Sequence, residues 1–283
     1  NYIQVLEDGG GNRYLSLNEG QGVHSQYHPE IYGYGRTWDY FLTAPYFNAA
    51  PYAPQSVRQI AIIGLAGGTI ARQYAHVYPH VAMDGIEIDP EIIQVGYDYF
   101  GIDPASVPQL HAIAGDGRYA LTQLAGPYDV IGIDAYRPPY IPWHLTTVEY
   151  FEEIRDKLTP DGTVVINVGR TPDDRRLVDA LTATMLQVFP SVHAMDVPHS
   201  FNTILVASMQ PTFAANLAAN LAALPEDTPS LLRDTLALGV SSLVPTAAGG
   251  EIFTDDRAPV ETLVDSLVLN FLLGGGAEML QSN

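Results

Sequence analysis

Acidic residues close three successive apolar runs of the sequence. Glu87, Asp116 and Asp134 each lie at the end of a short stretch that is typical of a buried strand. Parallel strands end at one edge of their sheet, and open sheets of this kind bind ligands at that edge. Carboxylates there could accept hydrogen bonds from a ligand or deprotonate an attacking nucleophile. The pattern favours a binding or catalytic site over a solvated rim.

A glycine-rich turn precedes the first of these carboxylates. Residues 60–63 lead into Gly64, Gly67 and Gly68, then into a helical pattern and a second strand that reaches Glu87. Glycines let a backbone approach a ligand, and the helix N-terminus presents free N–H groups. A carboxylate about twenty residues further on is placed to accept both ribose hydroxyls. We expect a nucleoside-type cofactor, although the spacing is not G-x-G-x-x-G and also fits a turn that serves packing only.

Strands and helices alternate through the middle of the chain. The expected strands are residues 60–63, 81–88, 110–114, 128–133 and 163–168, with helices expected at 91–100, 118–124, 147–158 and 173–189. Residues 192–197 and 202–208 are expected to pair as the last two strands. This order predicts an α/β fold: a Rossmann-like, doubly wound sheet with an antiparallel end.

The N-terminal residues predict a small β unit. Residues 2–6 and 13–17 alternate apolar and polar side chains around a glycine-rich turn, which is typical of a hairpin, and residues 23–27 follow as a third strand. In the aromatic-rich connector after them, residues 37–47 could form a helix with Thr37 as its N-cap. The aromatic side chains could cover a flat ligand or pack the small sheet on the core.

Length and composition limit the function classes. The 283 residues predict a β unit with its connector at 1–52 and a Rossmann-like catalytic domain at 53–283. No run of about eighteen apolar residues occurs, so we expect no membrane segment. With 32 acidic and 13 basic residues, the formal charge of −19 disfavours nucleic acid and attracts small cations, or simply serves solubility. The absence of cysteine excludes disulfides and thiolate metal sites, and it is compatible with a cytoplasmic location.

The motifs, taken together in this order, resemble those of the polyamine aminopropyltransferases, the spermidine and spermine synthase family. The resemblance covers about residues 1–275 and rests on IIGLAGGT, IEIDPE, GDGR, the long stretch that begins YDVIGIDAYRPPYIPW, and FTDDRAPVE. It implies the S-adenosylmethionine-dependent methyltransferase-like fold. The chain looks closest to the subgroup in which a synthase-like domain is often joined to a membrane transporter-like part.

The resemblance also implies roles for individual residues. The co-substrate would be decarboxylated S-adenosylmethionine or S-adenosylmethionine, and no metal is required because the sulfonium is its own activated leaving group. The implied cofactor contacts are Gly64, Gly67 and Gly68 beside its amino-acid portion, Glu87 at the ribose, and Asp116 with Gly117 at the adenine amino group. Asp134 would help to deprotonate the attacking amine. Tyr136, Arg137 and His24 would contact the substrate.

Three positions depart from the family pattern. The glycine loop is one residue shorter than G-G-G-D-G-G and lacks its aspartate, which would face the amine of the decarboxylated cofactor. Arg137 replaces the second aspartate of D-S-S-D-P, and a cation there would repel a polyamine and could instead pair with a carboxylate. His24 stands near the position where the family usually has glutamine.

Three functions therefore stay open. The first is a spermidine synthase-like transfer of an aminopropyl group to a small-molecule amine, with release of methylthioadenosine. The second is a methyltransferase or another enzyme that uses intact S-adenosylmethionine, which the lost loop aspartate and Arg137 favour. The third is a non-catalytic nucleoside-binding domain, the soluble part of a membrane-associated protein. Synthases of this family commonly form homodimers, and residues 263–273 could lie in such an interface or form a terminal helix.

Overall fold

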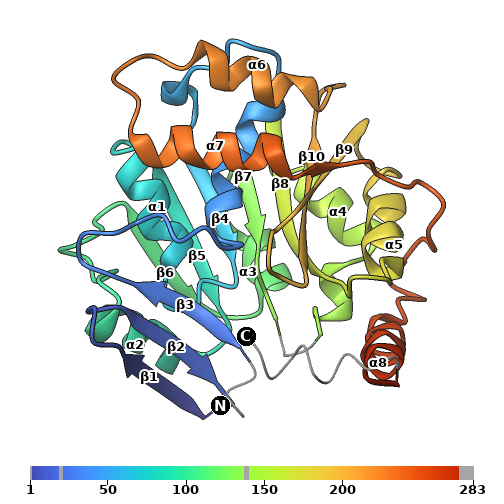
Figure 1. Cartoon of the computed structure of the whole chain (residues 1–283), viewed down its shortest axis with the longest axis horizontal. Coiled ribbons are helices and arrows are strands. Elements are labelled where there is room, and N and C mark those ends of the chain that lie inside the picture. Colours follow the sequence, from blue (N-terminus) through green and yellow to red (C-terminus); the bar gives the residue numbers. More distant parts are fainter. Residues whose placement is uncertain (1, 19–21, 137–139, 274–283) are drawn as a thin grey trace.

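A single eight-stranded sheet forms the centre of the computed structural model, which describes residues 2–18, 22–136 and 140–273 (Figure 1). Its strands are β4 Gln59–Ile63, β5 Ala82–Glu87, β6 Leu110–Ala114, β7 Tyr128–Ile133, β8 Leu158–Gly169, β9 Ser191–Asp196, β10 Asn202–Ser208 and β11 Leu243–Val244. They lie side by side in the order β11-β9-β10-β8-β7-β4-β5-β6. The expected strands are therefore all present, with β11 added at one edge.

Strand directions place several chain ends at one edge of this sheet. β4 pairs in parallel with β5 and β7, β5 with β6, and β7 with β8. β10 runs antiparallel between β8 and β9, so it begins at the edge where β8 and β9 end. The predicted Rossmann-like sheet with an antiparallel end is confirmed. Its carboxyl edge carries the predicted acidic residues.

Helices cover both faces because the central strands are apolar on both sides. The helices are α1 Thr69–Val77, α2 Pro90–Tyr99, α3 Gly117–Gln123, α4 Val148–Arg155, α5 Arg176–Met185, α6 Ala215–Ala223, α7 Ser230–Ser242 and α8 Val260–Phe271. Along β8, Val164 and Ile166 pack with residues of α3, α4, α5 and α8, whereas Val165 packs with α1, α6 and α7. Within the described ranges, no helix is long and apolar enough to cross a bilayer.

The N-terminal β unit has the predicted form. Strands β1 Ile3–Glu7, β2 Arg13–Leu17 and β3 Val23–Tyr27 make an antiparallel meander that packs on α2. β3 is also bonded to the main domain, because the backbone N–H of Gln26 donates to Thr69 Oγ1 at 2.9 Å. The small sheet therefore lies against the glycine turn and the start of α1. A division of the chain at residues 52 and 53 stays a prediction.

The connector differs from the expected capped helix. It forms a 3₁₀-helix, η1 Asp39–Phe47, that begins after Trp38 without a side-chain cap, so the prediction of Thr37 as N-cap is wrong. Asp39 instead turns back and accepts hydrogen bonds from the backbone N–H groups of Tyr34 and Gly35 at 2.9 and 2.7 Å. η1 is buried throughout and packs against α6 and α7, two helices that were not expected. Its aromatic residues therefore serve the core.

We predict that Gly64→Ala destabilises the protein. Gly64 follows β4 with φ of 87°, and a Cβ there would overlap the backbone carbonyl of Asp134. The left-handed conformation alone costs about 1–2 kcal/mol in a residue with a Cβ. Urea denaturation should show a larger loss than this, whereas Gly9→Ala, where a Cβ would meet nothing within 4 Å, serves as the control. Equal stability of the two variants would contradict the prediction.

Candidate active site

A cleft of about 1070 Å³ runs along the carboxyl edge of the main sheet. Seven residues singled out from the sequence line it: His24, Gly64, Glu87, Asp116, Gly117, Asp134 and Tyr136. Gly67 and Gly68 do not line it. The N–H of Gly67 donates to Ser25 Oγ at 2.8 Å, and Gly68 opens α1 with φ of 85°. Arg137 lies outside the described residues.

Glu87 ends β5 and is held by the glycine turn. Its side chain is only 7% exposed, and Oε2 accepts a hydrogen bond from the backbone N–H of Ala66 at 2.9 Å, while Oε1 accepts one from Asp89 at 3.3 Å. Burial raises the pKa of Glu87, and these backbone N–H groups act in the opposite direction. Each carboxylate oxygen keeps a further lone pair, so Glu87 can still accept from hydroxyl groups in the cleft.

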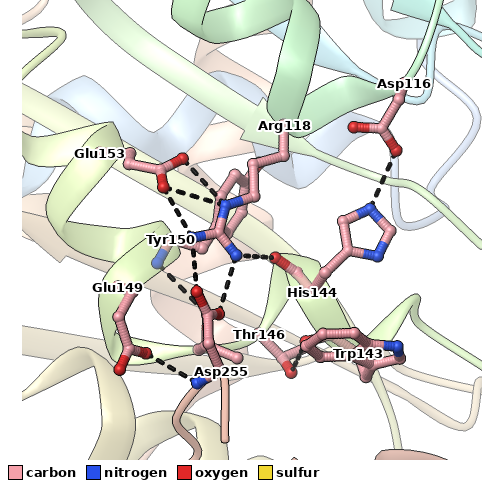
Figure 2. A network of polar contacts seen from close by, with 10 residues as sticks. Asp116, Arg118, Trp143, His144, Thr146, Glu149, Tyr150, Glu153 and Asp255 are labelled. Carbon is pink, nitrogen blue, oxygen red and sulfur yellow. Dashed lines mark hydrogen bonds and ion pairs between the residues drawn. The ribbon is translucent and has the colours of Figure 1, made fainter.

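Asp116 follows β6 and is the N-cap residue of α3. Its Oδ1 accepts a hydrogen bond from the N–H of Tyr119 at 2.9 Å, and its Oδ2 lies 3.0 Å from Nε2 of His144 (Figure 2). Gly117 follows because a side chain has no room there: a Cβ would lie 2.5 Å from Cγ2 of Ile63. The sequence reasoning missed His144, which stands in η3 Trp143–Leu145 and lines the same cleft.

Arg118 ties this end of the cleft to the C-terminal FTDDRAPVE segment. Its guanidinium donates to both oxygens of Glu153 at 2.6–3.0 Å and to both oxygens of Asp255 at 2.8 and 2.9 Å (Figure 2). A further N–H donates to the carbonyl of His144 at 3.2 Å, and Thr147 donates to Asp255 at 2.6 Å. The two carboxylates raise the pKa of Arg118. Arg118 thus fixes the backbone of the residue that contacts Asp116.

Asp134 follows β7 and is the acid at the middle of the cleft. Its Oδ1 accepts a hydrogen bond from Nδ2 of Asn167 at 2.9 Å. The orientation of the Asn167 amide is fixed because its Oδ1 accepts a hydrogen bond from Nδ2 of Asn202 at 2.8 Å. Burial raises the pKa of Asp134 to about 6, against the lowering effect of hydrogen bonds from Asn167 and Trp38. A carboxylate with this pKa is mostly ionised at pH 7 and still binds a proton readily.

The walls beside Asp134 come from two elements. Tyr136 lies two residues after Asp134, and its hydroxyl donates to the carbonyl of Asn167 at 2.9 Å. His24 reaches the cleft from β3, and burial lowers its pKa, which favours the neutral imidazole. Beyond Asn167 the cleft continues to Arg170, Phe201 and α8, none of which the sequence reasoning had singled out for this site.

The described residues contain no group of three or more His, Cys, Asp or Glu side chains arranged to hold a metal ion. The polar groups of the cleft are instead spread along the edge of the sheet. Carboxylates lie at the ends of β5, β6 and β7, and amides lie on β8 and β10. This arrangement can bind an elongated polar ligand and accept a proton near its middle.

Sequence comparisons relate the chain to known proteins. The family model described as "Spermine/spermidine synthase domain" matches residues 48–212. The chain is 32% identical to a "Probable polyamine aminopropyl transferase" of Bifidobacterium longum, covering 93% of this chain and 60% of that protein. It is 34% identical to a "Polyamine aminopropyltransferase" of Vibrio vulnificus, over 58% of this chain and 52% of that protein. The chain thus spans little more than half the length of these curated relatives.

Solved structures share the fold. A probable spermidine synthase from Corynebacterium glutamicum superposes with a TM-score of 0.68 and 23% identity, covering 89% of this chain and 92% of that one. A spermidine synthase in complex with the transition state analogue AdoDATO gives 0.59 and 17%, covering 83% and 85%. Human methyltransferase-like protein 13 in complex with SAH gives 0.56 and 21%, covering 70% and 92%. The methyltransferase-like form of the fold, expected from the motifs, is confirmed.

We predict that Arg118→Ala lowers the free energy of unfolding by about 2–3 kcal/mol, the worth of one hydrogen bond between charged groups, because the partly exposed carboxylates of Glu153 and Asp255 regain water. Two carboxylates lose these bonds in the variant. Arg155→Ala is the control, since Arg155 makes more exposed ion pairs with Glu152 and Asp156 that are worth less than about 1 kcal/mol. Urea denaturation measures both. Similar losses in the two variants would show that Arg118 is an ordinary surface cation.

Proposed function

The chain belongs to the spermine/spermidine synthase domain family, and from this premise we propose that it transfers an aminopropyl group from decarboxylated S-adenosylmethionine to an amine. Methylthioadenosine is the second product. One observation carries the proposal: Asp134, a carboxylate with a pKa raised to about 6, shares a single cleft with Glu87 and Asp116. The cleft therefore combines acceptors suited to an adenosine with a base suited to an amine.

The cofactor occupies the end of the cleft formed by β4, β5 and β6. Glu87 accepts hydrogen bonds from the ribose hydroxyls, and Asp116 with Gly117 contacts the adenine. The turn at Gly64 supports the amino-acid or aminopropyl portion, and Gly67 and Gly68 shape this turn without lining the cleft. Two neighbours in the comparison support an adenosyl ligand, because one was solved with AdoDATO and the other with SAH.

Transfer is a single displacement at carbon. The amine nitrogen attacks the propyl carbon bonded to the sulfonium, the C–N bond forms, and the C–S bond breaks with its electron pair on sulfur. The proton of the amine passes to Asp134, which Asn167 holds in place at 2.9 Å. Tyr136 and His24 border the acceptor amine. The cleft holds the amine nitrogen and the carbon bonded to sulfur in line, and this alignment supplies the rest of the rate enhancement.

Methyl transfer from intact S-adenosylmethionine is the second candidate. The shortened glycine loop favours it: Ala66 stands in the loop with φ of 47°, and the family's loop aspartate is missing. Without that acid, the amine of the decarboxylated cofactor loses a partner. Product analysis with each cofactor and one amine separates the candidates, since aminopropyl and methyl products differ in mass. A cytoplasmic location and a homodimer stay predictions.

We predict that Glu87→Gln weakens binding of methylthioadenosine by about 1.5–3 kcal/mol, the worth of a hydrogen bond to a charged group. The amide keeps the size of the side chain but replaces one acceptor oxygen with a donor. Calorimetry measures the affinity, with Glu91→Gln on the exposed face of α2 as the control. Unchanged affinity in Glu87→Gln would remove Glu87 from the nucleoside site and, with it, the proposed orientation of the cofactor.

We predict that kcat/KM for the amine falls about tenfold per pH unit below pH 6, because the base must be ionised to accept the proton. Asp134→Asn should lose this limb and about 10²–10⁴-fold of the rate, as removal of a general base does. Asp98→Asn on the exposed face of α2 is the control. The protonated fraction of the free amine changes with pH in the same way for the parent protein, Asp134→Asn and Asp98→Asn. A pH profile that Asp134→Asn leaves unchanged would rule out Asp134 as the base.

A further inference from the structure

The cleft continues past Asp134 into an apolar lobe, defined here by residues of α5, α8 and the segment before β10. Its lining residues are Leu177, Phe201, Val264, Leu267, Val268 and Phe271. The rings of Phe201 and Phe271 pack edge to face with centroids 5.3 Å apart. This lobe lies on the side of Asp134 away from Glu87, because β8 and β10 follow β7 in the sheet while β4 and β5 precede it. It is where the body of an acceptor would lie.

The only charged side chain that lines this lobe, among the described residues, is a cation. Arg170 is 12% exposed, its Nε donates to Thr203 Oγ1 at 3.1 Å, and it lies 3.5 Å from Asp196. Arg175 also binds Asp196, at 2.6 and 2.9 Å, so two guanidinium groups share one carboxylate. Of these three residues, Arg170 alone lines the cleft, so it presents a guanidinium to the lobe, whereas the carboxylate of Asp196 does not line it.

The acidic residues of the cleft lie elsewhere. Within the part of the chain that the structure describes, the acids that line it are Glu87, Asp89, Asp116 and Asp134. The first three belong to the ends of β5 and β6, at the cofactor side. Asp134 alone faces the reacting amine. A second ammonium group in the lobe would therefore lie among apolar side chains beside the cation of Arg170, and it would lose part of its hydration without gaining a carboxylate.

We propose that the acceptor is a primary amine with an apolar body and no second positive charge, and that the apolar lobe with Arg170 sets this preference. The proposal rests on the proposed function, since it names the acceptor class of the same transfer. Its physical basis is the difference between burying a hydrocarbon end, which is favourable, and burying an unpaired ammonium, which is costly.

Binding of matched amines tests the proposal without turnover. Protein saturated with methylthioadenosine is titrated with hexylamine and with 1,6-diaminohexane, which differ only in the second amino group. We expect hexylamine to bind roughly tenfold more tightly than the diamine. The second ammonium of the diamine would be desolvated in the lobe, and no carboxylate there would offset this cost. Equal affinities, or tighter binding of the diamine, would overturn the proposal.

A carboxylate placed in the lobe should reverse the preference. Val268 lines the lobe from α8 and is 41% exposed, so Val268→Asp can fold without burying a charge deeply. Leu269 is the matched control, because it is 57% exposed on the same helix and does not line the cleft. We expect Val268→Asp to improve diamine binding several-fold and Leu269→Asp to leave the ratio unchanged, with thermal melting confirming that both fold. The same ratio in Val268→Asp as in the parent protein would also overturn the proposal.

Failure of the proposed function would give a different result. In a separate assay, decarboxylated S-adenosylmethionine is supplied with either amine, and products are identified by mass. If no aminopropyl product forms with any amine, the transfer is wrong, whereas the ratio of binding affinities still reports on the lobe. If products form but the diamine is bound and used as well as hexylamine, the transfer stands and the acceptor class proposed here does not.

Discussion

The close approach of the backbone at Gly64 to that at Asp134 sets the geometry of the whole cleft. The N–H of Gly64 donates to the carbonyl of Ile86 at 2.9 Å, and the N–H of Asp134 donates to the carbonyl of Ile63 at 2.8 Å. Three neighbouring strands, β5, β4 and β7, are therefore joined at their very ends. Gly64 has no side chain that would separate the turn after β4 from the turn after β7. Glu87 and Asp134 therefore line one continuous cleft.

The sequence predicted that Glu87, Asp116 and Asp134 lie at one edge of the sheet, and the reason is local. Strands buried on both faces are short apolar runs, and a carboxylate at the end of such a run lies at the carboxyl edge whatever the loops do. The placement of Asn167 and Asn202 depends instead on how strands pair across the sheet. Asn167 contacts Asn202 because β10 inserts antiparallel beside β8, and neither amide shows a motif in its own stretch. The register of an inserted strand is not visible in a single sequence.

Two other failures have equally physical causes. Residues 37–47 were expected as a capped helix, but Pro45 and the backbone contacts of Asp39 produce a 3₁₀-helix without a side-chain cap. α6 was missed because ANLAANLAA, rich in small residues, gives weak periodicity. FTDDRAPVE supported the family resemblance without a known purpose, and the contact of Asp255 with Arg118, 137 residues away in the chain, supplies one. The sequence motif alone does not identify Arg118 as the residue that it contacts.

Global and local electrostatics favour different ligands here, and distance decides between them. The formal charge of −19 concentrates small cations around the molecule. At physiological salt this field is screened over about 8 Å, so inside the cleft the nearest groups dominate. In the cleft, Asp134 is followed by a wall that Arg170 and the aromatic pair of Phe201 and Phe271 form. Under the proposed function, the surface charge would raise the encounter rate of amines as a class, whereas the lining of the lobe would select among them by their second charge.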